Sequence, residues 1–282
     1  MLVSIITINY NNKEGLRKTV ESVIHQNFNS FEFIVIDGGS TDGSFEVIQE
    51  YKKYIDYWVS ESDNGIYNAM NKGIAKAQGK YCNFMNSGDC FANSDVLKHI
   101  FTNENKADII CGNTYWTKWT EPPKEITFDS LFNGTICHQC AFINRRLLLK
   151  YKYDEKLKIV ADRKFFLQSL IFENCSYQAL DIDVVIYDLN GFSSQNRVLS
   201  DLEYLQVLEE LIPKRIRIDY GRKYKGILYG DTDYEKLFFE IGQRKYRDYI
   251  YTIVVFLMKI IALFIHSAKF ISLYPMRLRK QK

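Results

Sequence analysis

The sequence of 282 residues lacks the cysteine patterns of a disulfide framework or a metal cluster. Its six cysteines are scattered, and the one CxxC spacing, Cys137-x-x-Cys140, has no second CxxC and no histidine pair to complete a tetrahedral zinc site. The Trp-Cys context of a thioredoxin is also missing. We therefore reject a zinc or redox role for this pair and interpret the other cysteines as small buried side chains.

Targeting and low-complexity segments are equally scarce. Residues 1–9 carry no charged side chain and are too short for a secretory signal, and the chain shows no internal repeat and no low-complexity linker. We therefore expect a cytoplasmic protein with reduced thiols.

Acidic side chains are absent from residues 249–282, and the charge of the chain is divided unevenly. Residues 1–213 hold 21 Lys and Arg against 28 Asp and Glu, whereas residues 214–282 hold 16 against 6, a net charge of +10. Pro213 and the glycines that follow it mark a loose join. We predict one domain over residues 1–212 and a basic, apolar helical appendage over residues 213–282.

The appendage contains an apolar stretch, residues 249–275, that is long enough to cross a bilayer. In a helix, however, Asp248, Thr252, Lys259 and His266 fall on one narrow stripe, and Lys259 would lie mid-bilayer in a crossing helix. A helix in the membrane interface, followed by basic residues that meet anionic head groups, fits better than a crossing helix or a nucleic-acid patch. We predict that residues 249–282 bind a membrane surface, which places the protein at the periphery of the cytoplasmic membrane. Burial of the stretch in protein is the alternative.

Short apolar runs alternate with segments of helical periodicity in the first third of the chain. Strands are expected near residues 3–9, 33–36, 57–59 and 81–85, and the segments after the first three have apolar residues at helical spacing. Such alternation is typical of a parallel sheet with right-handed crossovers. Ligands of these sheets lie at the carboxyl ends of the strands, where we expect five polar residues to converge on one cleft: Thr7, Asn9, Asp37, Asp63 and Asp89.

Four ordered motifs lie at these strand ends and in the helix after the third strand. They are residues 4–11 (SIITINYN), 36–43 (IDGGSTDG), 63–73 (DNGIYNAMNKG) and 86–89 (NSGD). They resemble the successive motifs of family 2 glycosyltransferases. The resemblance implies an α/β fold of the GT-A type, Rossmann-like, with a mostly parallel central sheet flanked by helices. It also implies a nucleotide-sugar half over residues 1–110 and an acceptor half over residues 111–212.

The resemblance assigns roles to the polar residues of the first half. Asp37 would read the base of a nucleotide sugar, usually uracil, and Asp89 would hold Mg²⁺ or Mn²⁺ on the diphosphate. Thr7, Asn9, Asp63, Asn71 and Asn86 would line the same donor site. Chemically, a carboxylate at a strand end can accept from a base N–H, and a divalent cation neutralises a diphosphate leaving group. Alternatively, Asp37 only caps a turn, as Asp-Gly pairs commonly do.

The chain departs from the family pattern at two positions. Gly88 stands where many members carry an additional Asp that holds the ribose, and Met70 stands where many carry an Arg. Lys72 would supply the missing cation to the phosphates, or would face solvent. Ribose and phosphate contacts are therefore open at this point.

The acceptor half of the family is similar to residues 136–142 (ICHQCAF) and 153–166 (YDEKLKIVADRKFF). Asp162 occupies the position of the catalytic base, which takes the proton of the acceptor hydroxyl. It would alternatively serve as a helix N-cap. His138 would line the acceptor side or reach the diphosphate, or serve as a structural histidine.

These observations predict an inverting glycosyltransferase that uses a nucleotide diphosphate sugar, usually of UDP in this family, and a hydroxyl of a surface glycan or lipid-linked glycan. A polyprenyl-phosphate sugar synthase would use the same donor site. A weakly catalytic binding subunit of a polysaccharide assembly complex is the alternative outside the enzymes.

Overall fold

The computed structural model describes residues 1–102, 107–189 and 196–223. The chain divides into two compact units, Met1–Ile212 and Pro213–Lys282. In the second unit the described residues form one helix, α10 (Lys214–Lys223), which exposes Ile216 and Ile218 beside its basic side chains. The apolar stretch over residues 249–275 lies outside the described residues.

The first unit is built on one mixed sheet with the strand order β3-β2-β1-β4-β8-β6-β9-β5, and β7 pairs with β6. The strands in this order, with β7 last, are β3 (Tyr57–Ser60), β2 (Phe31–Asp37), β1 (Val3–Asn9), β4 (Tyr81–Phe84), β8 (Ala141–Asn144), β6 (Ile109–Tyr115), β9 (Tyr177–Ile186), β5 (Cys90–Phe91) and β7 (Trp119–Thr120).

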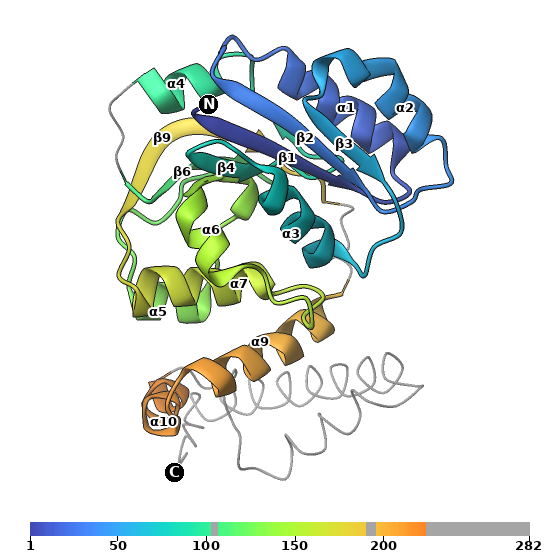
Figure 1. The fold of residues 1–282 in the computed structure, drawn as a ribbon. Helices are drawn as coiled ribbons and strands as arrows, with labels where there is room; N and C mark the ends of the chain where they lie inside the picture. Colours follow the sequence, from blue (N-terminus) through green and yellow to red (C-terminus); the bar gives the residue numbers. More distant parts are fainter. Residues whose placement is uncertain (103–106, 190–195, 224–282) are drawn as a thin grey trace, which may run out of the picture. The chain divides into compact units, whose positions relative to one another are not determined.

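Helices cover both faces of this sheet (Figure 1). Helices α1 and α2 pack together on one face, and α3 and α6 lie on the other. Their bounds, with those of the remaining helices of the first unit, are α1 (Lys13–Ile24), α2 (Ser44–Tyr51), α3 (Ile66–Lys76), α4 (Val96–Thr102), α5 (Phe128–Asn133), α6 (Arg145–Tyr151), α7 (Ala161–Phe166) and α9 (Arg197–Leu211). Shorter turns of helix are η1 (Lys52–Tyr54), η2 (His138–Cys140) and the π-helical η3 (Leu167–Phe172).

The first four strands in space confirm the expected parallel arrangement. β1 pairs in parallel with both β2 and β4, and β2 pairs in parallel with β3. All seven residues of β1 are buried, as expected of a strand covered by helices on both faces. The side chain of Asn12 caps α1 by accepting from the backbone N–H of Gly15, which confirms that helix start.

The other half of the sheet is mixed rather than parallel. β8 runs antiparallel to β4 and β6, whereas β6 and β9 pair in parallel. Strands β4 and β8 are separated along the chain by β5, α4, β6, β7, α5 and η2, so no simple alternation continues past β4. This departure places β6 and β9 far from β2 within one sheet.

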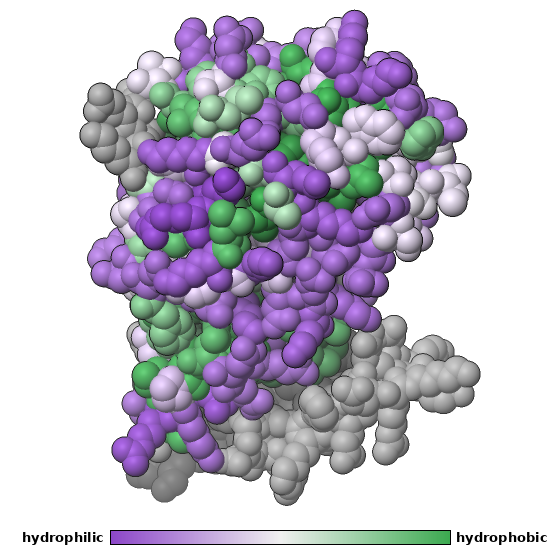
Figure 2. Space-filling view, in the orientation of Figure 1, coloured by the Kyte–Doolittle hydropathy of each residue, from purple (hydrophilic) through white to green (hydrophobic). Residues whose placement is uncertain are grey.

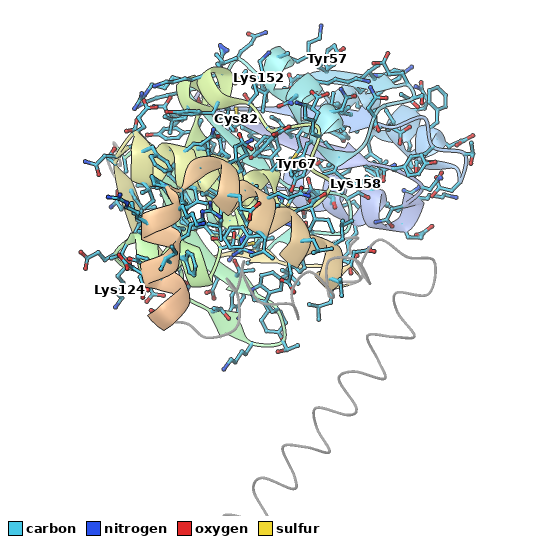
Figure 3. The ribbon with its side chains drawn as sticks, turned by 90° about the horizontal axis from the view of Figure 1, so that it is seen from below. Tyr57, Tyr67, Cys82, Lys124, Lys152 and Lys158 are labelled. Carbon is cyan, nitrogen blue, oxygen red and sulfur yellow. The ribbon has the colours of Figure 1, made fainter. Side chains whose placement is uncertain are left out.

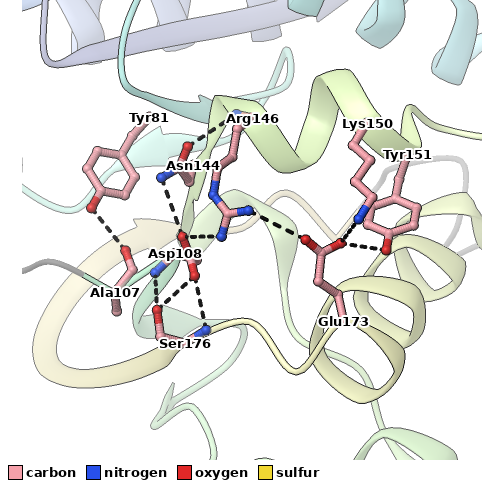
Figure 4. Close-up of polar contacts among 9 residues, drawn as sticks. All are labelled: Tyr81, Ala107, Asp108, Asn144, Arg146, Lys150, Tyr151, Glu173 and Ser176. Atoms are coloured by element: carbon pink, nitrogen blue, oxygen red, sulfur yellow. Dashed lines mark hydrogen bonds and ion pairs between the residues drawn. The ribbon is translucent and has the colours of Figure 1, made fainter.

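A polar network joins the start of β6 to α6 and to the segment before β9 (Figure 4). Asp108 accepts from Arg146 at 2.7 Å and from Ser176, and Arg146 also contacts Glu173 at 3.4 Å. The Arg146 side chain is 54% exposed, so the network positions these segments more than it stabilises the fold.

Polar residues cover most of the molecular face shown in Figure 2, with scattered apolar side chains among them. Within the ranges that the structure describes, no helix combines the length and the apolarity needed to span a membrane.

Candidate active site

A cleft of about 1170 Å³ opens along the carboxyl ends of the parallel strands. Its walls come from the ends of β1, β2 and β4, from the start of α3, from η2, from residues 158–163 and from β6. The strand-end loops therefore converge as the sequence predicts. Tyr67 and Lys158, which both line the cleft, are labelled in the view from below (Figure 3).

Four of the predicted donor-site residues line this cleft: Asn9, Asp63, Asn86 and Asp89. Thr7 lies behind the wall. Its fully buried hydroxyl donates to the carbonyl of Met85 at 2.7 Å, so Thr7 fixes the end of β4 against β1. Asp63 is half-buried and accepts from the N–H of Gly65 at the start of α3.

Asp37 also lies behind the wall, with no exposed surface. Its carboxylate accepts from Asn9 at 2.7 Å, from Ser60 at 2.6 Å, and from both the hydroxyl and the N–H of Ser40. Although burial raises the pKa of Asp37, these hydrogen bonds outweigh burial and hold its pKa below the ordinary value. In this structure Asp37 holds the turn at Ser40, and Asp63 is the carboxylate that lines the cleft on this side. Reading of the base by Asp37 stays a prediction.

Asp89 is a buried carboxylate in the cleft wall, 4% exposed. Gln139 Nε2 donates to Oδ2 at 3.0 Å, and the N–H of Asp188 donates to Oδ1 at 2.8 Å. Burial outweighs these hydrogen bonds and raises the pKa of Asp89 to about 6. A nearby cation would stabilise the ionised form of a carboxylate held in this way.

The backbone of Gly88 lies against the side chain of Asp188. A Cβ at position 88 would lie 2.5 Å from Asp188 Oδ2, and the backbone there has φ of +106°. A side chain at residue 88 would therefore be strained by the backbone conformation and would require the Asp188 side chain to move. The side chain of Asp188, which follows β9, occupies the space that a side chain at residue 88 would need.

His138 joins the donor loop to the predicted base. Its Nδ1 lies 3.0 Å from Asp162 Oδ2, and its Nε2 lies 3.1 Å from Asn86 Nδ2. A neutral ring that donates from Nδ1 and accepts at Nε2 satisfies both contacts. Burial lowers the pKa of His138, but the hydrogen bond and the charge of Asp162 outweigh burial and raise it.

Asp162 is held at the cleft wall by three groups. Besides His138, the hydroxyl of Tyr67 lies 3.1 Å and the N–H of Arg163 lies 2.9 Å from Oδ1. Burial raises the pKa of Asp162, but His138 above all lowers it, so that its pKa lies below the ordinary value. The N-cap of α7 is Val160, not Asp162, so Asp162 is an ionised group in the cleft rather than the helix cap.

Two predicted residues lie away from the cleft. Asn71 donates to the carbonyl of Tyr153 and to Glu155, and accepts from the N–H of Tyr153, which ties α3 to that loop. Lys72 pairs with Glu61 at 2.7 Å at the surface. The structure therefore gives both side chains partners within the protein and does not bring them to the donor site.

Three thiols, Cys111, Cys137 and Cys140, line the cleft beside η2. The sulfurs of Cys111 and Cys140 are 3.1 Å apart, and Cys137 contacts Gln139. Across the residues that the structure describes, no group of three or more His, Cys, Asp or Glu side chains has the geometry to hold a metal.

Three further residues belong to the site, although no role was expected for them from the sequence. Tyr67 and Gln139 stand within quoted motifs, but their partners, Asp162 and Asp89, are far away in the chain. Asp188 follows the end of β9, and a search for polar residues after each strand would have found it.

The carboxylates of Asp89 and Asp188 decide whether a divalent cation fits this site. Asp89 and the neighbouring Asp188 offer oxygen ligands of the kind that Mg²⁺ and Mn²⁺ accept, and few protein ligands suffice where phosphate oxygens complete the shell. Burial raises the pKa of Asp89, and a cation bound at its oxygens would favour the ionised carboxylate. The residues present therefore fit such an ion.

The chain matches the model of glycosyl transferase family 2 over residues 4–158, more than half its length. It is 29% identical over 253 residues to an uncharacterized glycosyltransferase of Mycobacterium tuberculosis, which covers 84% of this chain and 96% of the relative.

Two solved structures share the fold at lower identity. Staphylococcus aureus TarS 1–349 in complex with UDP-GlcNAc matches with a TM-score of 0.59 and 19% identity over 74% of this chain and 67% of that one. A mannosyltransferase of Pyrobaculum calidifontis in complex with GDP-Man and Mn²⁺ matches with a TM-score of 0.58 and 14% identity over 74% of this chain and 64% of that one. Together with the family model, the fold and the cleft show that this chain belongs to glycosyl transferase family 2 and is a glycosyltransferase of the GT-A fold.

Proposed function

We propose that the protein transfers a sugar from a UDP-sugar to a hydroxyl of a glycan, with inversion at the anomeric carbon and with Asp162 as the base. The observation that carries the proposal is the contact between His138 and Asp162 on the wall of the cleft that Asp89 also lines. Adjacent residues, His138 and Gln139, hold the base and the diphosphate-side carboxylate.

Asp162 is suited to accept a proton because its lowered pKa keeps it ionised at neutral pH. The acceptor oxygen attacks the anomeric carbon while its proton passes to an Asp162 oxygen. The bond from that carbon to the diphosphate oxygen breaks, and the nucleoside diphosphate leaves with the bonding electron pair. His138 and Tyr67 hold the carboxylate in place and limit its rotation.

On the donor side, Asp89 and Asp188 would hold a divalent cation. Such a cation would neutralise the charge of the diphosphate leaving group. The Mn²⁺ bound to the mannosyltransferase of the same fold supports this assignment. Asp63 and Asn9 face the part of the cleft between β1 and β3, where they would contact the nucleoside. The UDP-GlcNAc bound to TarS supports UDP as the nucleotide.

Residues 213–282 would hold the enzyme at the cytoplasmic face of a membrane. The support is the net charge of +10 over residues 214–282 together with the apolar stretch at 249–275. Helix α10 adds exposed Ile216 (44%) and Ile218 (41%) among basic residues, which suits an anionic lipid surface better than nucleic acid.

The experiment that tests the function is a screen of nucleotide sugars for release of free nucleotide, with Mn²⁺ and with excess chelator. We expect release from one UDP-sugar that requires the metal. Absence of release from every donor, with UDP still bound, would instead favour a binding subunit.

A further inference from the structure

Two aromatic rings form a platform in the cleft at the end of β6 and β9. The ring centroids of Trp116 and Tyr187 are 4.1 Å apart, with a tilt of 40° between the planes. Both side chains line the cleft, and Trp116 is 36% exposed. An exposed indole that packs against a second ring is a rigid surface that loses little entropy when a ligand covers it.

The strand register directs both rings to the cleft. Thr114 and Trp116 lie two positions apart on β6 and its extension, so their side chains point to the same side, and both line the cleft. Tyr115 pairs with Ile186 across the ladder to β9, so Tyr187 stands beside Trp116.

The neighbouring Trp119 provides a contrast. It pairs with Tyr115 across the β6–β7 ladder and packs on that ring instead, with centroids 5.3 Å apart. It is 40% exposed but is not among the residues that line the cleft. The hairpin thus carries two tryptophans of similar exposure, of which one faces the site.

The platform lies on the acceptor side of the reacting centre. β2 and β3, which carry the nucleoside side, stand at one edge of the sheet, and β6 and β9 follow only after β1, β4 and β8. Tyr187 directly precedes Asp188, whose N–H donates to Asp89. A group on the platform therefore lies next to the diphosphate side and away from the nucleoside.

Charge near the platform distinguishes two acceptor classes. Glu121, which directly follows β7 on the same hairpin as Trp116, lines the cleft, whereas the cations that line it, Lys158 and Arg163, come from the segment before and within α7. Arg163 is already stacked over the ring of Tyr204 at 3.3 Å. Carboxylates repel an acceptor phosphate but accept hydrogen bonds from sugar hydroxyls.

We propose that Trp116 and Tyr187 form an acceptor subsite that stacks on the apolar face of a pyranose ring, with Glu121 bonding its hydroxyls. The acceptor end is then a sugar residue rather than a lipid phosphate. This inference rests on the proposed function, because it names the acceptor class of the same cleft.

The test measures ligand binding to the full chain and to two matched variants, Trp116→Leu and Trp119→Leu. The probes are methyl pyranosides of glucose, galactose, mannose and N-acetylglucosamine, and farnesyl phosphate, each titrated with UDP and Mn²⁺ present and followed by ligand-observed NMR. We expect at least one pyranoside to bind the wild type and Trp119→Leu equally. Trp116→Leu should bind it about five- to tenfold more weakly, a loss typical of one aromatic stacking contact.

UDP affinity serves as the check on folding and should be the same in all three proteins. No pyranoside binding to the wild type, equal binding by Trp116→Leu, or farnesyl phosphate binding that depends on Trp116 would each overturn the inference. Its failure is separable from failure of the proposed function, because donor hydrolysis is measured without any acceptor. A wild type that hydrolyses a UDP-sugar yet ignores every pyranoside contradicts the subsite alone.

Discussion

His138 Nδ1 lies 3.0 Å from Asp162 Oδ2, and the opposite nitrogen of the same ring meets Asn86. One imidazole therefore connects the loop that follows β4 to the carboxylate that opens α7. Because both side chains are largely buried, at 15% and 13% exposure, the contact is shielded from solvent and holds Asp162 in one orientation.

Replacing the base is the most direct test of the site. Asp162→Asn keeps the size of the side chain but cannot accept the proton, so we expect turnover to fall by about 10²–10⁴. UDP affinity should change little. Asp154→Asn, which alters a carboxylate paired with Lys164 outside the cleft, is the matched control and should keep its turnover. Retained turnover in Asp162→Asn would place the base elsewhere.

The raised pKa of Asp89 predicts a pH-dependent affinity for metal. A divalent cation binds the ionised carboxylate, so protons compete with it below a pH of about 6. Calorimetric titration with Mn²⁺ and UDP should show affinity falling by about tenfold per pH unit below that value and levelling above it. In Asp89→Asn the metal dependence should be lost. Wild-type affinity that is flat from pH 5 to 8 would contradict the role of Asp89.

The pair formed by His138 and Asp162 predicts how stability varies with pH. The pKa of His138 is raised above its ordinary 6.5, so its contribution is complete below pH 6.5 and is lost as pH rises through the folded value. The pKa of Asp162 is lowered from 3.8, so its contribution is present above that pH and is lost in stronger acid.

We expect the Tm of the wild type to fall as pH rises above 6.5, and this slope to flatten in His138→Gln. The control His25→Gln changes an exposed histidine and should keep the wild-type slope. Parallel curves for all three proteins would show that the His138–Asp162 pair does not govern stability in this range.

Substitution of Asp37 should lower the stability of the protein, whereas substitution of Asp63 should change its preference among nucleotides. Asp37→Asn puts an amide NH₂ among the donors of Ser40, Ser60 and Asn9, and should cost about 1–3 kcal/mol of unfolding free energy. Asp63→Asn should leave stability nearly unchanged but weaken the preference for UDP over GDP and ADP, measured calorimetrically. The opposite pattern would support Asp37, rather than Asp63, as the residue that reads the base.

The appendage should decide where the protein is found. A chain that ends at Arg247 should lose its binding to vesicles of anionic lipid while it keeps its UDP affinity, since the cleft residues lie before residue 201. The full chain should bind anionic vesicles at low salt and release them as salt rises. A full chain that ignores anionic vesicles at low salt would argue for burial of the stretch in protein.

The parallel half of the fold could be predicted from the sequence because each strand is apolar and is followed by a polar turn and a helical period. The positions of Asn9, Asp63 and Asp89 follow from this alternation alone. The mixed half could not be predicted in the same way, since its strands pair with partners far away in the chain. Asp188 is recognisable as a polar residue after a strand, but nothing in the sequence indicates that it lies against Gly88.

The other features that the sequence does not predict are the partners within the protein that occupy the side chains of Asp37 and Lys72. Nothing in the motif around Asp37 indicates that Ser60, at the end of another strand, takes up one of its oxygens. Lys72 likewise has a carboxylate, Glu61, within reach on the preceding loop. In each case the competing partner is a residue that only the folded chain brings close.

Gln139 and His138 are neighbours in the chain, yet one holds Asp89 and the other holds Asp162. One peptide unit therefore fixes the distance between Asp89, the proposed diphosphate-side carboxylate, and Asp162, the proposed base. Inserting one glycine between these two residues would alter no side chain of the site. It would nevertheless uncouple the two halves of the reaction, leaving donor cleavage to water while transfer to the acceptor is lost.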